Sequence, residues 1–230
     1  MHVARIAELL QPFLMPIPDS SPAEPQGSGG EPAVLSSAQL QSVSTYIDIL
    51  TRWNSRINLT SIRDPEEIVT RHFGESLFAA RCLFPGGSGA SGDGEKRIAD
   101  LGSGAGFPGI PIKLWAPDVQ LTLIESNHKK ATFLREVCRL LTLMNVDIQN
   151  VRGDQVSQRY DVVTLRGVEN FAGALRTAAQ LLSPAGRLAL LIGSSQLGSA
   201  RATLPDMDLK APVPVPLSQS RMLLLGQCRT

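Results

Sequence analysis

Residues 99–115 read ADLGSGAGFPGIPIKLW, and this stretch decides the fold that we expect for the chain. Its four glycines, at positions 102, 104, 106 and 109, follow a short apolar run and precede a second one. Glycine suits sharp turns and places where the backbone approaches a ligand closely. The stretch therefore predicts a tight turn that leaves a buried strand and enters a helix.

The composition is that of a globular protein with one main core: 230 residues, 43% hydrophobic and 19% charged. A formal net charge of +1 gives no overall basic field, so a nucleic-acid partner needs a local cluster of Lys and Arg. The three cysteines, 82, 138 and 228, lack C-x-x-C spacing, and we expect neither disulfides nor a metal site. Without a signal peptide or an apolar run of about 18 residues, we expect a cytoplasmic protein.

The N-terminal part is interrupted by two segments rich in Pro, Gly and Ser. Residues 11–32 predict a mobile linker, to which we assign no structure. Between the two segments we expect helices over 36–60, capped by Ser36 or Ser37, and over 64–84, capped by Asp64 with Pro65 in the first turn. We therefore predict four parts: an N-terminal segment with the linker (1–35), a small helical cap (36–84), a flexible glycine-rich loop (85–96) and the main domain (97–230).

From residue 97 onward, short apolar runs alternate with segments of helix length. The runs predict strands over 97–102, 120–125, 146–152, 160–166 and 186–193, with helices over 129–143 and 169–182. This alternation predicts an α/β fold with a doubly wound, mostly parallel sheet. Such sheets bind ligands beyond the carboxyl ends of the strands, at the topological switch point, where the glycine-rich turn would lie.

Two ligand classes fit the glycines. Gly104, Gly106 and Gly109 spell G-x-G-x-x-G, which is typical of dinucleotide sites, whereas the alternate residues from 100 to 106 spell D-x-G-x-G-x-G. The second spelling also accounts for Asp100, whose carboxylate would serve the ammonium group of S-adenosylmethionine. Glu125 ends the second strand, where an acid receives ribose hydroxyls in either class. A purely structural turn remains the third interpretation.

Five stretches resemble one known family in their order and spacing. That family is the bacterial small-subunit rRNA guanine-N7 methyltransferase G family, also called glucose-inhibited division protein B, and the resemblance covers about residues 38–193. It implies a Rossmann-like fold and transfer of a methyl group from S-adenosylmethionine to guanine N7 in a stem-loop of 16S rRNA near the decoding site. The stretches are RWNSRINLTSI (52–62), RHFGESL (71–77), ADLGSGAGFPGIPI (99–112), KKATFLREV (129–137) and YDVVTLRGV (160–168).

The resemblance also implies a set of cofactor-binding residues. It places Gly102 and Phe107 at the methionine and adenosine moieties, Glu125 at the ribose and Arg166 at the end of the fourth strand, facing the cofactor. Gly153 and Asp154 would lie beside the adenine. An acid at Asp154 can by itself accept a hydrogen bond from the adenine amino group, although the pair can equally form an ordinary turn. With Asp100 and Gly104, these residues complete the predicted cofactor site.

The chain departs from the family pattern at three places. Glu75 stands where an aspartate usually follows R-H-F, and Leu165 and Gly167 flank Arg166 where Ser and Ala are usual. Ile192 occupies a position, just before Gly193, where a lysine is usual. If that lysine touches RNA or cofactor in the family, this chain must manage without it. A non-catalytic RNA-binding relative is therefore one alternative function.

The residue pattern also bears on mechanism. No cysteine follows the fourth strand in a context suited to cytosine C5 methylation, and no D/N-P-P-Y/F turn suited to amino-group methylation is present there. Guanine N7 has an in-plane lone pair and no proton at neutral pH, so it needs no general base, and we predict no catalytic side chain. A methyltransferase acting on a small molecule is a second alternative, because its core would look the same.

Basic residues near the crevice are the candidates for RNA contact. We expect a monomeric protein whose partner is 16S rRNA or the 30S subunit, with no metal and no membrane. Asn58 and Thr60 either fix a helix junction or face RNA, and His72 either satisfies its helix or meets the RNA. The RNA-contact candidates are Arg52, Arg56, His72, Lys129, Lys130, Arg152 and Arg166.

Overall fold

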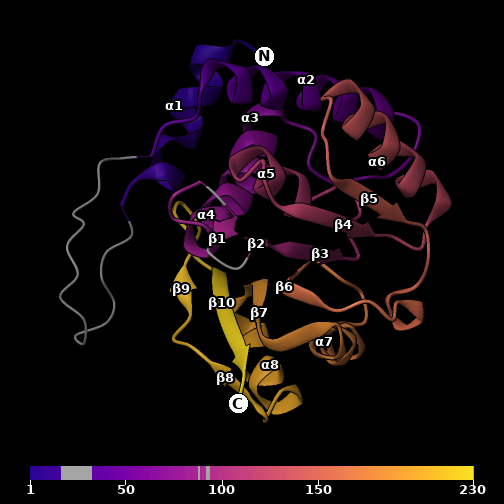
Figure 1. Cartoon of the computed structure of the whole chain (residues 1–230). Helices are drawn as coiled ribbons and strands as arrows, with labels where there is room; N and C mark the ends of the chain where they lie inside the picture. Colours follow the sequence, from indigo (N-terminus) through magenta and orange to yellow (C-terminus); the bar gives the residue numbers. More distant parts are fainter. Residues whose placement is uncertain (17–32, 88, 92–93, 230) are drawn as a thin grey trace.

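The protein is an eight-stranded, mostly parallel sheet with helices on both faces (Figure 1). The computed structural model describes residues 1–16, 33–87, 89–91 and 94–229. The strand order is β5-β4-β3-β6-β7-β10-β8, with β9 paired to β10. The parallel strands are β3 (Arg97–Leu101), β4 (Gln120–Ile124), β5 (Val146–Gln149), β6 (Tyr160–Arg166) and β7 (Leu182–Gly193). The predicted α/β fold with a doubly wound sheet is confirmed.

The C-terminal part, for which the sequence predicted no elements, completes the sheet with antiparallel strands. β10 (Arg221–Cys228) pairs antiparallel with β7 and with β8 (Met207–Leu209), and β9 (Val213–Pro214) pairs with β10. A 3-10 turn over Ser194–Gln196 and helix α8 (Leu197–Thr203) connect β7 to β8. The antiparallel β10 therefore lies directly beside β7 and brings its first residue, Arg221, opposite Gly193.

The helices divide between the two faces of the sheet. On one face lie α1 (Val3–Leu14), α2 (Ser37–Asn54), α4 (Glu75–Leu83), α5 (Gly109–Trp115) and α6 (His128–Leu140). The other face is covered by α7 (Phe171–Gln180) and α8, below the sheet in Figure 1. Two apolar clusters form, one on each face.

The predicted helix over 64–84 is present, but it is not α-helical throughout. Asp64 caps α3 (Pro65–Glu67) by accepting a hydrogen bond from Glu67, as predicted. A π-helix (Ile68–Gly74) follows and then continues as α4. Such π turns are rare and often occur at functional sites. Ser36 caps α2 through a capping box with Gln39, and α2 ends at Asn54 rather than at residue 60.

The prediction of a structureless linker from residue 11 is wrong for residues 11–14, because α1 extends through Leu14 with Pro12 inside it. Ile6, Leu10 and Phe13 recur on one helical face and are buried, and this packing outweighs the helix-breaking tendency of the proline. Residues 17–32 of the predicted linker lie outside the described residues. The segment 85–96 contains the short strands β1 (Ala90–Ser91) and β2 (Gly94–Glu95).

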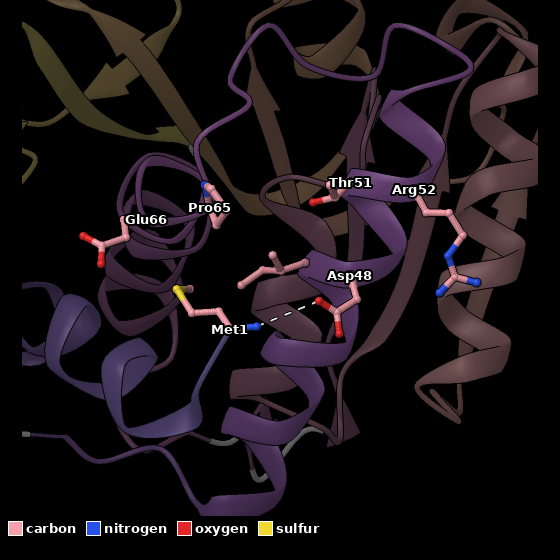
Figure 2. Close-up of a pocket in the computed structure, with 7 residues that line it drawn as sticks. Met1, Asp48, Thr51, Arg52, Pro65 and Glu66 are labelled. Carbon is pink, nitrogen blue, oxygen red and sulfur yellow. Dashed lines mark ion pairs between the residues drawn. The ribbon is translucent and has the colours of Figure 1, made fainter.

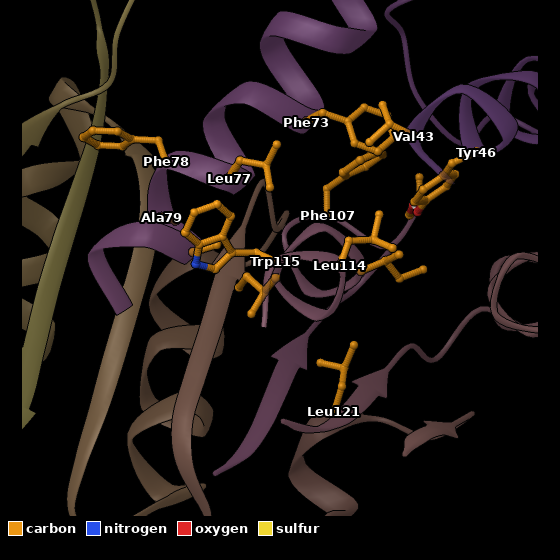
Figure 3. Packing of buried hydrophobic residues seen from close by; sticks show 14 of the residues in the cluster. Val43, Tyr46, Phe73, Leu77, Phe78, Ala79, Phe107, Leu114, Trp115 and Leu121 are labelled. Carbon is orange, nitrogen blue, oxygen red and sulfur yellow. The ribbon is translucent and has the colours of Figure 1, made fainter. Parts of the chain in front are cut away.

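The N-terminal helices share one core with the sheet rather than forming a separate lobe. Figure 3 shows Val43, Tyr46 and Phe73 of the helices packed toward Phe107 and Leu114 of the main domain. Phe13 of α1 lies against Gly74, where an added Cβ atom would overlap its ring. The cap is therefore positioned against the glycine-rich turn by continuous apolar packing.

We predict that the Phe13→Ala substitution lowers the free energy of unfolding by about 3–5 kcal/mol, the usual cost of truncating a buried phenylalanine. Phe13 is 1% exposed, so its removal leaves a cavity between α1 and the π-helix. Urea denaturation measures the effect. The matched control is Met15→Ala, because Met15 is 45% exposed just beyond the helix and should change stability by less than about 0.5 kcal/mol. Equal stabilities of the two variants would contradict the packing assigned to α1.

Candidate active site

The glycine-rich turn runs from the end of β3 to the start of α5, over the carboxyl edge of the sheet. Gly102 and Gly104 both have positive φ, +71° and +56°, which side chains other than glycine rarely adopt. A Cβ atom on Gly104 would meet only the Gly102 carbonyl, at 3.8 Å, so this part of the turn opens on a free space. The turn thus leaves bare backbone facing the switch point between β3 and β6.

Two carboxylates fix the turn from below. Asp100 is 1% exposed, and its Oδ2 accepts a hydrogen bond from the Gly109 amide (3.1 Å) while its Oδ1 accepts one from the Thr164 hydroxyl (2.8 Å). Burial raises the pKa of Asp100 to about 6, against the lowering effect of these hydrogen bonds. Asp100 does not line the crevice. The structure therefore places Asp100 under the turn, where it holds the start of α5, and its predicted contact with the cofactor ammonium group stays a prediction.

Glu125 is the second carboxylate and does face the crevice. Its Oε2 accepts a hydrogen bond from the Gly104 amide (2.9 Å), and its Oε1 accepts one from the Asn127 amide (2.7 Å). Each carboxylate oxygen keeps a further acceptor position beyond these bonds. A ligand with neighbouring hydroxyl groups could therefore bind Glu125 without disturbing the turn.

The crevice has a volume of about 590 Å³ and lies between the carboxyl edge of the sheet and the cap. From the sheet side it is lined by the turn and by the ends of β4 and β6, and from the cap side by the loop around Thr60 and by the π-helix. An adjoining hollow of about 350 Å³ shares Gly102, Ser126 and Val168 with it and contains Gly153 and Asp154. A Cβ atom on Gly153 would overlap Leu101, so packing alone already requires that glycine.

A buried glutamate with three arginines forms one wall of the crevice. Glu75 is 1% exposed, and Arg71 Nε (3.0 Å), Arg166 (3.1 Å) and Arg221 Nε (3.5 Å) all lie within ion-pair distance of its carboxylate. All three arginines line the crevice, and although Arg71 also pairs with Glu67 at 3.7 Å, two carboxylates do not neutralise three guanidinium groups. Burial lowers the pKa of Arg166 to about 10, which leaves it charged at neutral pH. This wall therefore carries a net positive charge.

His72 lies beside that wall, in the cap-side lining of the crevice, and is 8% exposed. Arg166 Nη1 lies 3.0 Å from His72 Nδ1, and the Thr60 hydroxyl lies 2.8 Å from His72 Nε2. Because a guanidinium only donates, Nδ1 must accept, and the imidazole is neutral with its proton on Nε2. Burial, together with Arg166, Arg71 and Arg221, lowers the pKa of His72 to about 3. His72 is therefore a neutral element of the cap and no cationic RNA contact.

An aromatic stack connects the cap to the turn. The Phe107 ring lies between Tyr46, at a centroid distance of 5.3 Å, and His72, at 4.7 Å, with both pairs nearly parallel. The Tyr46 hydroxyl donates a hydrogen bond to the Ala105 carbonyl of the turn. Figure 3 shows Tyr46, Phe73 and Phe107 gathered at this point. The conformation of the turn thus depends on two cap residues.

The remaining RNA-contact candidates lie at different places. Lys130 lines the crevice, and Lys129 lies beside it on α6. Arg152 forms an ion pair with Asp154 (3.0 Å) beside the adjoining hollow. Arg56 is exposed after the end of α2.

Arg52 lies at a separate hollow of about 660 Å³ on the cap, which includes no residue of the glycine-rich turn. Figure 2 shows its side chain extending away from Met1 and Asp48, which pair with each other at 3.9 Å. Glu66, which also lines this hollow, is held by Arg5 at 2.7 Å. This hollow therefore offers few free polar groups, and we place the active site in the crevice.

Three residues of the site were not predicted from the sequence to belong to it: Tyr46, Arg71 and Arg221. Tyr46 has the apolar spacing of a core position, and Arg221 lies in the segment for which no element was predicted. Glu75 stood out only as a departure from the family pattern, which was the available signal. Ile192 is 1% exposed and lies in the core on the α7 face of the sheet, so this position supplies no cation to the crevice. Arg221, which pairs with the neighbouring Gly193 across the two strands, supplies one instead.

Cysteine and metal chemistry are not suggested by the described residues. Burial raises the pKa of both Cys82 and Cys138 to about 11, so neither thiol is an activated nucleophile. No group of three or more His, Cys, Asp or Glu suited to a metal is found among the residues that the structure describes. Within the same residues, no helix is both long and apolar enough to cross a membrane.

The fold, with its glycine-rich turn and acidic strand end, is that of a Rossmann-like methyltransferase. Magnesium protoporphyrin IX methyltransferase from Synechocystis PCC 6803, solved with bound S-adenosylmethionine, superposes with a TM-score of 0.61 at 13% identity, over 82% of this chain and 97% of that one. The ribosomal protein L11 methylase of Lactobacillus delbrueckii subsp. bulgaricus gives a TM-score of 0.55 at 14% identity, over 68% and 80% of the chains.

The particular family follows from sequence comparison. The model of the GidB family, rRNA small subunit methyltransferase G, matches residues 39–216, and the chain belongs to this family. Ribosomal RNA small subunit methyltransferase G of Xylella fastidiosa (strain M23) is 40% identical over 162 residues, 70% of this chain and 72% of the relative. The protein of the same name from Stenotrophomonas maltophilia (strain K279a) is 43% identical over 150 residues, 64% of this chain and 66% of the relative. The chain is thus an S-adenosylmethionine-dependent rRNA small subunit methyltransferase.

We predict that neutral His72 makes stability dependent on pH. The unfolded histidine binds a proton near pH 6.5 while the folded one binds it near pH 3, so the stabilisation is complete above pH 6.5 and is lost as the pH falls below it. Between pH 7.5 and 5, the unfolding free energy of the wild type should fall by about 2 kcal/mol more than that of His72→Asn. The asparagine oxygen can still accept from Arg166 but does not titrate.

Urea denaturation at the two pH values measures both stabilities. The raised pKa of Asp100 has the opposite effect on the pH dependence, but it is common to both proteins and cancels in the comparison. Parallel stability curves for wild type and His72→Asn would contradict the buried, neutral state of His72.

Proposed function

We propose that the crevice transfers a methyl group from S-adenosylmethionine to N7 of a guanine in 16S rRNA. The cofactor would lie on the sheet side, with its ribose at Glu125, its methionine part along Gly102 and Gly104, and its adenine in the adjoining hollow beside Asp154. The fit is supported by the free acceptor positions of Glu125 and by the open space over Gly104. When bound, the cofactor supplies an electrophilic methyl group on a sulfonium.

The observation that carries the choice of guanine N7 is the hydrogen bonding of the buried groups around the crevice. The Nδ1 lone pair of His72 accepts from Arg166, and both oxygens of Glu125 accept from backbone amides. His72 is thus not poised to remove a proton, the remaining acceptor positions of Glu125 are assigned to the ribose, and Glu169 is exposed at the rim. A ring nitrogen that carries no proton at neutral pH is the nucleophile that such a site can serve without a general base.

The chain's own contribution would then be positioning and exclusion of water. Phe107 and His72 close the cap side of the crevice with apolar ring surface, and the aromatic stack keeps the turn in one conformation. A fixed alignment of nucleophile and methyl group can account for a large part of the rate in such a reaction. The target guanine would be unstacked to enter the crevice.

RNA binding would use the positive wall and the basic residues around the opening. Arg71, Arg166, Arg221 and Lys130 face the crevice, and Lys129 lies beside it. Guanidinium groups suit phosphate oxygens because they donate several hydrogen bonds in one plane. The near-neutral net charge is compatible with this assignment, because the cations are concentrated at one site. We further propose a cytoplasmic monomer that acts on the 30S subunit or its 16S rRNA.

We predict that the purified protein, incubated with tritiated S-adenosylmethionine and 30S subunits from a strain lacking the gene, places label in 7-methylguanosine. Digestion to nucleosides and chromatography identify the labelled base. Label in another nucleoside would contradict the guanine-N7 reaction. Cofactor binding without any labelled RNA would favour a small-molecule methyltransferase or a non-catalytic RNA-binding relative.

In the same assay, Arg166→Ala should reduce the rate of methyl transfer at least about tenfold, because it removes a cation of the wall and leaves the buried Glu75 with fewer partners. The matched control is Arg176→Ala, since Arg176 is an exposed arginine on α7. Unchanged kinetics of Arg166→Ala would remove Arg166 from the site.

A further inference from the structure

Thr60 is held rigidly at the cap side of the crevice. It belongs to the loop between α2 and α3, and its backbone is fixed from both sides by one side chain. Asn54 Nδ2 donates to the Thr60 carbonyl (2.9 Å), and Asn54 Oδ1 accepts from the Thr60 amide (3.0 Å). Asn54 is itself buried. The Thr60 side chain therefore has a defined place in the lining of the crevice.

The polarity of the hydrogen bonds around Thr60 follows from Arg166. A guanidinium carries only donors, so the 3.0 Å contact from Arg166 Nη1 makes His72 Nδ1 an acceptor. The imidazole then carries its hydrogen on Nε2 and donates it to the Thr60 hydroxyl oxygen, 2.8 Å away. The lowered pKa of His72, about 3, keeps this arrangement unchanged across the physiological range.

The Thr60 hydroxyl is thereby forced to be a donor. Its oxygen also accepts a hydrogen bond from the Ile62 amide, at 3.1 Å. A hydroxyl has two acceptor positions and one hydrogen, and both acceptor positions are filled. Among the residues that the structure describes, no group accepts the remaining hydrogen. That hydrogen is available to a hydrogen-bond acceptor in the crevice.

We infer that Thr60 is the residue that recognises the target base, by donating a hydrogen bond to guanine O6. The inference rests on the proposed function. Guanine presents N7 and O6 side by side on one edge, both as acceptors, whereas adenine presents a donor amino group beside N7. A fixed donor near the methylated nitrogen therefore favours guanine, because adenine would leave two donors facing each other.

The position of Thr60 favours the base over the cofactor as its partner. The residues assigned to the cofactor, Gly102, Gly104, Glu125 and Asp154, all belong to the sheet side of the crevice or to the adjoining hollow. Thr60 lies on the opposite, cap side, together with Leu59, Ser61 and His72. A substrate that enters between cap and sheet would place its base between these two walls.

The test compares two substrates and three proteins. 30S subunits are reconstituted with 16S rRNA that carries either guanosine or 2-aminopurine riboside at the methylated position, which is mapped first with the wild-type protein. 2-Aminopurine keeps N7 and the 2-amino group but lacks O6. The proteins are the wild type, Thr60→Val, which removes the hydroxyl at nearly constant volume, and Thr60→Ser, which retains it. The rate constant kcat/KM for methyl transfer is measured for each combination.

On guanosine, Thr60→Val should lose about tenfold in kcat/KM, the worth of one hydrogen bond, while Thr60→Ser should stay within about twofold of wild type. The wild type should lose about tenfold on 2-aminopurine, and on that substrate Thr60→Val should equal the wild type. The dissociation constant of S-adenosylmethionine, measured by calorimetry, should be the same for all three proteins within about twofold.

Three results would overturn the inference while 7-methylguanosine is still formed by the wild type. Equal losses by Thr60→Val on both substrates would mean a structural role, weaker cofactor binding would assign the hydroxyl to the cofactor, and unchanged kinetics would assign it no role. If Thr60→Val does not fold, the wild-type protein still tests the inference. Equal kcat/KM values of the wild type on guanosine and 2-aminopurine would contradict recognition of O6. Absence of 7-methylguanosine with the wild type would overturn the proposed function itself, and the inference with it.

Discussion

The stacking of Phe107 between Tyr46 and His72 is the interaction on which the rest of the site depends. A turn with several glycines of positive φ has little conformational preference of its own. Here the turn is held by the stacked ring of Phe107 at its centre and by two hydrogen bonds. The Tyr46 hydroxyl donates to the Ala105 carbonyl, and the Glu125 carboxylate accepts from the Gly104 amide. Because two of these contacts come from the N-terminal helices, the cap is part of the proposed cofactor site rather than a cover over it.

The same stack links the turn to the charges of the crevice wall. His72 touches Phe107 with its face and binds Arg166 and Thr60 with its two nitrogens. Arg166 in turn shares the buried Glu75 with Arg71 and Arg221, which come from the π-helix and from β10. Elements far apart in the sequence thus converge on one hydrogen-bonded cluster, and its polarity is set by arginine, which can only donate.

Local patterns were sufficient to predict the five parallel strands, but they predicted neither the antiparallel strands β8, β9 and β10 nor the contacts of the site. The strand β6 was predicted over the residues that form it, because a buried parallel strand is a continuous apolar run. Gly102, Gly104, Phe107 and Glu125, to which the strand ends and the family resemblance pointed, line the crevice, and their contact with the cofactor stays a prediction. Asp100 was assigned to the cofactor, but the sequence could not show that its carboxylate turns toward Gly109 and Thr164. The π turn shifts the helical phase, so the burial of His72 and Glu75 was not visible from a periodicity of 3.6 residues.

The central claim is that the cap controls cofactor binding through the turn, and calorimetric titration of S-adenosylmethionine into Tyr46→Phe tests it most directly. The substitution keeps the stacked ring but removes the hydrogen bond to the Ala105 carbonyl. The matched control is Tyr160→Phe, because Tyr160 is also fully buried but lies at the start of β6, at the opposite end of that strand from the crevice. We expect the dissociation constant to rise about tenfold for Tyr46→Phe and to stay near the wild-type value for Tyr160→Phe. Equal affinities of Tyr46→Phe and the wild type would contradict the account.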